Sequence, residues 1–243
     1  MGASILRDCK LWVGGYNLSG DSNRLAYKDE YDKLEIPAFG YAAKRRIAGL
    51  PSVAFEQEGW MWSDGTTGPD DALSALRGVT GTPITIGPLT GAAGESGWFS
   101  TITLLQLSHG GEVSSPYSFK ASGEGNDYPL IHGTILENSA KTSTGSGTVR
   151  TLGAVTSTQK IYAALHVLAV SGTNPTLDMT VLSAVTNWGT PTTRITFAQK
   201  TAVGAQFATP VAGPVTDTYW RAAYTIGGTN SPSFTVAVVV GIQ

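Results

Sequence analysis

The fold class is decided by one stretch in the first half of the chain, Ser52-Val53-Ala54-Phe55-Glu56-Gln57-Glu58-Gly59-Trp60. Its side chains alternate in character, so that Val53, Phe55 and Gln57 fall on one face and the residues between them on the other. A repeat of two residues is the signature of a β-strand with one buried and one wet face. We therefore predict a strand here.

The remaining composition is also that of a β protein. Of 243 residues, 30 are Gly and 12 are Pro, and they separate short runs rich in Thr, Val, Ala and aromatic residues. Such runs predict strands where Gly, Pro, Asn and Ser supply the turns. We expect these strands at 10–13, 23–36, 82–86, 97–107, 113–121 and 130–136, and later at 149–155, 160–170, 176–184, 193–199, 206–212, 218–226 and 233–242.

One helix interrupts this pattern. Pro69 occupies a favoured first helical position, and Asp70 and Asp71 follow it, where a negative charge interacts well with the helix dipole. The run 72–76, Ala-Leu-Ser-Ala-Leu, supplies an apolar stripe, and Gly78 is placed to end the helix. The first half of the chain is thus predicted to be a β-sandwich or barrel with a single flanking helix.

Charge divides the chain into two unlike parts. Residues 1–138 carry 10 Lys and Arg against 16 Asp and Glu, a net charge of −6, whereas residues 139–243 carry 6 against 2, a net charge of +4. The change falls in a small, polar stretch, 139–148, that has the composition of a linker. We therefore expect a first β domain at 1–138 and a second, a β-sandwich, at 149–243.

The sequence gives little support for a catalytic site or a metal-binding site. The single cysteine excludes an internal disulfide, and three histidines without nearby partner ligands suggest no metal centre. Glu56 and Glu58 share a strand face, but a glycosidase needs two carboxylates that face each other across a cleft. Trp60 and Trp62 are more typical of a core or an interface than of a sugar platform. We expect no enzyme activity and no cofactor.

The order of elements resembles the major tail, or tail tube, proteins of long-tailed bacteriophages. The resemblance begins with Val13-Gly14-Gly15-Tyr16-Asn17-Leu18-Ser19-Gly20-Asp21-Ser22, which leads into a long charged ribbon. A loop with Phe39-Gly40 and Arg45-Arg46-Ile47-Ala48-Gly49-Leu50-Pro51 follows, then the strand 52–60 and the helix at Asp70–Leu76. From Gln159-Lys160-Ile161-Tyr162 onward the chain is similar to a domain fused to such tail proteins, with Ala202-Val203-Gly204-Ala205-Gln206 and Thr216-Asp217-Thr218-Tyr219-Trp220-Arg221 as its most recognisable pieces.

This resemblance implies a structural role in the virion. Six subunits would close a β-barrel around a lumen, and stacked rings would form the tube that conducts DNA without binding it specifically. The partners implied are further copies of the chain and other tail proteins, such as the tape measure and the tail terminator. Assembly would take place in the host cytoplasm. From the linker composition, the reversal of net charge and the different strand chemistry, we expect the second domain to lie outside the tube, in reach of host-surface glycans. The alternative is a virion decoration or glycan-binding β-sandwich protein.

Two sets of residues are candidates for functional surfaces, one for the contact between rings and one for the lumen. The loop at Ala38–Leu50 would contact the neighbouring ring, through Phe39, Lys44, Arg45, Arg46 and Ile47. An acidic lumen would repel DNA phosphates, and its candidate residues are Asp29, Asp32, Glu35, Glu56 and Glu58. Which alternating set faces inward stays open, because a shift of one residue in register exchanges the two faces of a strand.

Overall fold

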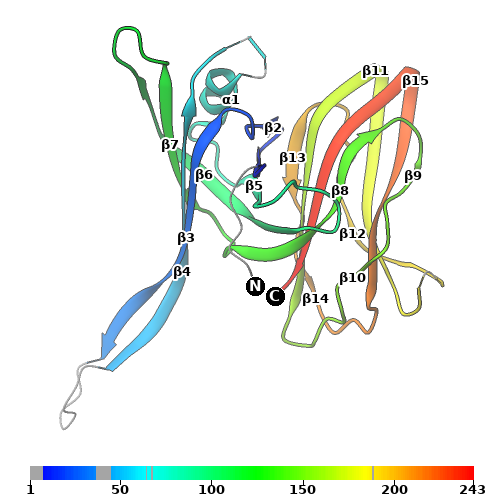
Figure 1. Ribbon diagram of the computed structural model, residues 1–243. Helices are drawn as coiled ribbons and strands as arrows, with labels where there is room; N and C mark the ends of the chain where they lie inside the picture. Colours follow the sequence, from blue (N-terminus) through cyan, green and yellow to red (C-terminus); the bar gives the residue numbers. More distant parts are fainter. Residues whose placement is uncertain (1–7, 37–44, 64, 67, 188) are drawn as a thin grey trace. The chain divides into compact units, whose positions relative to one another are not determined.

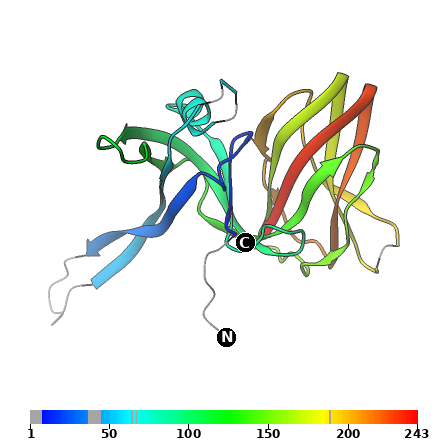
Figure 2. The ribbon, with the colours of Figure 1, turned by 45° about the horizontal axis from the view of Figure 1, so that its top comes forward.

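The computed structural model describes residues 8–36, 45–63, 65–66, 68–187 and 189–243 (Figures 1 and 2). The protein is mainly β, with antiparallel pairing between its strands and a single helix among the described residues, as predicted. That helix is too short to cross a membrane. The chain forms two compact units: unit 1 comprises Met1–Asp21, Thr82–Thr101 and Ile131–Gln243, and unit 2 comprises Ser22–Gly81 and Ile102–Leu130.

Unit 2 is built on a sheet with the strand order β3-β4-β7-β6. Its strands are β3 Ser22–Ile36, β4 Arg45–Trp60, β7 Ser118–Gly125 and the part of β6 Ser96–Gly110 that begins at Ile102. The predicted alternation in β4 is confirmed, because Val53, Phe55 and Gln57 are buried. One face of the sheet is therefore the core of this unit, and the other is polar.

The predicted helix is α1 Pro69–Leu76, also in unit 2. Its apolar residues Ala72 and Leu73 are fully buried. Gly78 follows with φ of 76°, a left-handed conformation that glycine adopts without strain, and its N–H bonds the carbonyl of Leu104 in β6. The helix thus ends where the sequence predicted, and the turn after it is tied to the sheet.

Unit 1 contains a β-sandwich organised by two long strands, β11 Lys160–Ala184 and β15 Tyr219–Ile242, which pair along almost their whole length. The first half of β11 pairs on its other side with β13 Gly204–Phe207 and β14 Val211–Ala212, and the second half pairs with β12 Thr192–Thr196. The sequence predicted two strands, 160–170 and 176–184, in place of β11. They are one strand with irregular pairing around Ser171–Thr176, and one hydrophobic core includes residues from both halves.

The other strands of unit 1 extend this arrangement. β8 Ile131–Lys141 pairs with the second half of β15, whereas β9 Gly145–Ser146 and β10 Arg150–Thr151 pair with its first half. The first strands of the chain form a small antiparallel group, in the order β2-β1-β5. They are β1 Lys10–Val13, β2 Tyr16–Asn17 and β5 Thr82–Gly87.

The linker expected at 139–148 has a different role in the structure. Residues 139–141 are the end of β8 and pair with β15, and Gly145 and Ser146 form β9, which pairs with the same strand. Small polar residues and glycine allow the tight connection between the two strands, and this composition is shared by turns and linkers. The two compact units therefore do not coincide with the expected segments 1–138 and 149–243.

Two hydrogen bonds of the His166 ring connect β11 to the N-terminal segment and to β5 within unit 1. Its Nδ1 lies 2.7 Å from the carbonyl oxygen of Gly14, and its Nε2 lies 2.8 Å from Oγ1 of Thr85. Since a carbonyl oxygen only accepts, Nδ1 carries the proton, and Nε2 accepts from the Thr85 hydroxyl. Complete burial lowers the pKa of His166 to about 4, so the ring is neutral at pH 7.

Candidate functional site

A two-stranded arm is the first feature that bears on function. The strands β3 and β4 pair with each other over their full length, but β7 joins β4 only from Ala54 onward. We call residues 29–36 and 45–53, where the ribbon has no third strand, the arm. It projects from the rest of unit 2 (Figure 1). A two-stranded ribbon offers almost no interior in which side chains can be buried.

The arm nevertheless carries large apolar side chains. Tyr31, Leu34, Ile47 and Leu50 are 52%, 51%, 50% and 77% exposed. Leu34 and Ile47 are directly opposite each other in the ladder, so their side chains share a face of the ribbon. Exposed apolar groups gathered on a projecting element are typical of an interaction surface.

The arm includes part of the segment Ala38–Leu50, in which we expected a loop. Phe39 and Lys44 lie outside the described residues, whereas Arg45, Arg46 and Ile47 are paired residues of β4. The prediction of a loop is therefore wrong from Arg45 onward. Gly49 and the basic residues before it are typical of a loop. In the structure, Gly49 lies beside Asp32 where the β3–β4 pairing shifts in register, and regular pairing continues on both sides of this shift.

The candidate lumen residues do not form one surface. Glu56 and Glu58 lie on the polar face of the sheet, opposite the buried residues of β4. Asp29 pairs directly with Val53 and therefore projects to the other face of the ribbon. Asp32 and Glu35 lie in the arm, beside and beyond the change in register that follows Tyr31.

Opposite charges accompany the carboxylates on the polar face. Nζ of Lys120 lies 3.7 Å from Glu56 and 3.4 Å from Glu58, and Nη1 of Arg24 lies 2.8 Å from Glu58. All four side chains are partly or largely exposed, so each pair contributes little to stability. Because of these basic partners, the polar face of the sheet is mixed in charge rather than purely acidic.

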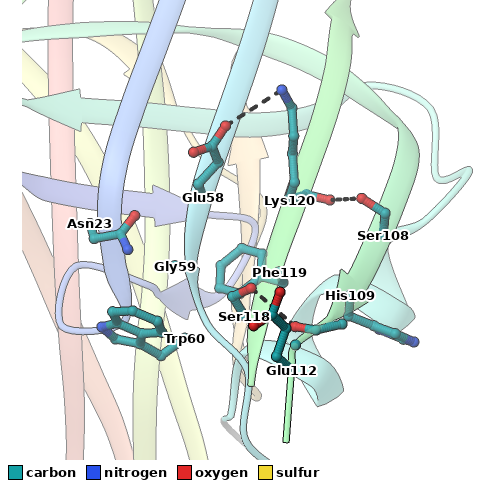
Figure 3. Close-up of a pocket in the computed structure, with 12 residues that line it drawn as sticks. Asn23, Glu58, Gly59, Trp60, Ser108, His109, Glu112, Ser118, Phe119 and Lys120 are labelled. Carbon is teal, nitrogen blue, oxygen red and sulfur yellow. Dashed lines mark hydrogen bonds and ion pairs between the residues drawn. The ribbon is translucent and has the colours of Figure 1, made fainter. Parts of the chain in front are cut away.

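A groove lies at the end of unit 2 where β4 finishes (Figure 3). It is open and has a volume of about 650 Å³. Trp60 and Asn23 line one side, Glu58 and Lys120 another, and Glu112 lies near Ser118. Trp60 is 45% exposed, so its indole is available to a bound group.

The serine hydroxyls that line the groove are hydrogen-bonded to the backbone. Ser118 Oγ donates to the carbonyl of Gly110 at 3.1 Å, and Ser108 Oγ donates to that of Lys120 at 3.4 Å. The imidazole of His109 packs beside the ring of Tyr117 and is not hydrogen-bonded to either hydroxyl. Within the described ranges, no cluster of three or more His, Cys, Asp or Glu is placed to hold a metal ion.

Sequence reasoning missed two charged residues of this groove. Lys120 follows the buried Phe119 and precedes the buried Ala121, so the period of two in the predicted strand at 113–121 contained the signal for its outward position. Glu112 lies outside β6 and β7, in their connection, where no periodicity applies. Its place in the groove depends on the pairing of these two strands, which only the fold reveals.

Comparisons with known proteins are sparse. No protein-family model matches the sequence, and no curated protein matches it either. A chain of the virion of a native gene transfer agent particle aligns with a TM-score of 0.44 and 7% identity, over 53% of this chain and 98% of that chain. The SPP1 Dit (gp 19.1) protein, a hub of the adsorption apparatus of phages infecting Gram-positive hosts, aligns with a TM-score of 0.39 and 11% identity, over 98% of this chain and all of that one. Likenesses this weak assign neither a family nor a function.

Proposed function

We propose that this protein is a structural virion subunit of a phage tail tube, which forms hexameric rings that stack around a lumen and conduct DNA. The observation that carries the proposal is the arm. Its four exposed apolar side chains have no interior of their own, and contact with another copy would bury them. The resemblance of the sequence to tail tube proteins points to the same kind of contact.

The sheet of unit 2 supports a ring. Among the described residues, β3 pairs only with β4, so one side of this 15-residue strand is a free edge. Long free edges promote association with other chains, and closure of a barrel removes them. In the proposed ring, the edge of β3 pairs with a strand of the neighbouring subunit, and the repeated pairing closes around the lumen.

The polar face suits the wall of an aqueous channel. Its carboxylates Glu56 and Glu58 are matched by Lys120 and Arg24, so the face presents few unbalanced positive charges that could hold DNA phosphates. We propose that this face lines the lumen. Asp29, on the opposite face of the ribbon, would not line it with them.

Further partners and the location follow from the same proposal. The protein assembles in the host cytoplasm, becomes part of the virion tail, and contacts the tape measure and tail terminator proteins. The C-terminal sandwich lies outside the tube, where host-surface glycans are accessible to it. The partners and the location rest on the sequence resemblance, and the exterior position of the sandwich rests on the composition and net charge of residues 139–243.

Electron microscopy of the purified full chain tests the function. Negative-stain images should show hollow cylinders or stacked rings with sixfold symmetry in end views. A decoration or glycan-binding protein would instead remain a monomer or a small closed oligomer at every concentration, and that result would remove the tube assignment.

A further inference from the structure

The sandwich of unit 1 has a small hollow beside the end of β15. Its volume is about 250 Å³, and its walls come from strands that are distant in the chain. Residues 132–134 of β8 and 240–242 of β15 form one wall, and Thr151 of β10 with the following Leu152 forms the other. The hollow is therefore a product of the folded sandwich and does not belong to a single loop.

Three polar side chains that line the hollow have unused hydrogen-bonding groups. His132, Thr134 and Thr151 make no side-chain hydrogen bond or ion pair to any other residue in the described part of the chain. His132 and Thr134 belong to β8 and Thr151 to β10, so polar groups are offered to the hollow from both of its walls. A few polar groups placed around a concave surface fix the orientation of a bound small molecule.

The walls of the hollow are held in place by contacts outside it. Arg150 of β10 donates from Nη2 to the carbonyl of Ala93 at 2.6 Å, and β10 also pairs with β15. On the other wall, the ring centroids of Trp98 and His132, direct partners across β6 and β8, are 4.5 Å apart. This second contact limits the orientations that the imidazole can adopt. A site that is formed before its ligand arrives loses less entropy on binding.

The lining favours an uncharged ligand with hydroxyl groups. Among the described side chains around the hollow there is no Lys, Arg, Asp or Glu, so no carboxylate, ammonium or guanidinium is available to balance an ionised ligand. Leu152 and Ile242, which pack against the core of the sandwich, supply apolar surface. Threonine hydroxyls and an imidazole can both donate and accept hydrogen bonds. A sugar ring matches this combination, because it has apolar C–H faces and hydroxyl groups that also donate and accept.

We propose that this hollow binds one ring of a neutral saccharide. Its hydrogen-bonding partners are Thr134, Thr151 and His132, and the side chains of Leu152 and Ile242 lie against a C–H face of the ring. The volume of the hollow is just below the roughly 300–1,000 Å³ of pockets for drug-sized ligands, which suits the terminal ring of a glycan better than a longer chain. This inference deepens the proposed function and rests on it for the access of host-surface glycans to the sandwich.

Titration of the full-length protein with neutral methyl glycosides, followed by saturation-transfer difference NMR, tests the site. The probes are the methyl glycosides of glucose, galactose, mannose and N-acetylglucosamine at up to about 100 mM. At least one should bind, with the millimolar affinity typical of a ligand with so few atoms.

Three substitutions locate the binding. Thr134→Val and Thr151→Val keep the shape of the side chain and remove one hydroxyl, so each should weaken binding by about fivefold. The double variant should show no detectable binding. Thr192→Val is the matched control and should bind normally, since Thr192 is an exposed strand residue of unit 1 that does not line the hollow.

The outcomes separate this inference from the tube function. Absence of binding by all four glycosides would overturn the saccharide site, whether or not tubes form. Binding that persists unchanged in the double variant would also overturn it, and loss of that binding in Trp60→Ser would assign the saccharide to the groove of unit 2. A wild-type protein that binds a glycoside through Thr134 and Thr151 but forms no tubes in electron microscopy would retain the site and overturn the tube function.

Discussion

Nη2 of Arg46 lies 3.2 Å from Oε1 of Glu35, across the two strands of the arm. The same carboxylate oxygen is 3.3 Å from Nε of Arg46, so two N–H groups of one guanidinium donate to it. Arg46 was expected in a contact loop and Glu35 in a lumen wall, and the structure makes them neighbours in one ladder. Their contact links β3 and β4 near the described end of the arm.

Reversal of the basic cluster should therefore impair assembly and leave the fold intact. Replacement of Lys44, Arg45 and Arg46 by Glu places a like charge opposite Glu35 and reverses the charge of this part of the sequence. The side chains of Arg46 and Glu35 are about half exposed, so the free energy of unfolding should change by less than about 1 kcal/mol. Sedimentation velocity should show no stacks, and stacks of normal length would refute the role of the arm.

The stability of the protein should fall as the pH is lowered from about 6.5 to 4. His166 is neutral in the folded state, with a pKa of about 4, whereas the unfolded chain takes up a proton below a pKa of 6.5. The unfolded state therefore binds more protons across this window, and protonation favours unfolding by up to about 3 kcal/mol at pH 4. The contribution of this group levels off about one pH unit below its folded-state pKa.

Denaturant unfolding of His166→Gln measures this contribution. The variant should be less stable than the wild type at pH 7.5, because its amide replaces both ring hydrogen bonds imperfectly. The difference between the two proteins should shrink toward pH 4. His109→Gln, at an exposed position, is the control and should follow the wild type. A constant difference at all pH values would contradict the burial of a neutral ring.

Loss of Asp217 should destabilise the sandwich of unit 1 strongly. Asp217 is buried, and its Oδ2 accepts hydrogen bonds from Ser183 Oγ at 2.5 Å and from Arg194 Nη2 at 2.7 Å. Burial raises the pKa of this carboxyl, but the hydrogen bonds and the Arg194 charge outweigh it, so the net pKa is lowered. Asp217→Ala removes the acceptor of the buried Ser183 hydroxyl and of Arg194 Nη2 and should cost about 3 kcal/mol.

Thermal and chemical denaturation test this value, with Asp178→Ala as the control. Asp178 lies on β11 and accepts only exposed hydrogen bonds, from Gln199 at 3.0 and 3.1 Å. Its loss should change the free energy of unfolding by less than about 0.5 kcal/mol. Equal effects from the two substitutions would show that the Arg194–Asp217–Ser183 group is not a stabilising network.

Much of unit 2 was predictable because short-range patterns govern it. The period of two in β4 and the Pro-Asp-Asp start of α1 act within a few residues, and both predictions are confirmed. The continuation of β4 through Arg45–Leu50 was missed because glycine and clustered charge resemble a loop. Cross-strand partners such as Leu34 for Ile47 stabilise this part, and they are not visible in the local sequence.

The organisation of unit 1 depends on contacts between residues far apart in the chain. The change of net charge near residue 138 suggested a boundary, yet Ser139 and Lys141 pair with Val236 and Phe234 on β15. Charge composition concerns the surface, whereas strand pairing determines which segments fold together. The groove of unit 2 was unpredictable for a similar reason, because four strands and the connection between two of them assemble it.

Truncation after Asn138 should consequently prevent proper folding. The cut falls within β8 and removes β15, with which residues 134–141 pair. It also removes His166, whose ring is hydrogen-bonded to Gly14 and Thr85. The expected product is aggregated or poorly structured in circular dichroism and size-exclusion chromatography. A soluble truncated chain that still forms rings would show that the N-terminal segment folds without β11 and β15.

Cryo-electron microscopy of the purified full chain, at increasing protein concentration, tests the central proposal most directly. The tube function predicts stacked hexameric rings, a lumen lined by the face that bears Glu56, Glu58 and Lys120, and an arm from each subunit in contact with the next ring. A protein that stays monomeric at all concentrations, or a tube in which this face points away from the lumen, would contradict it.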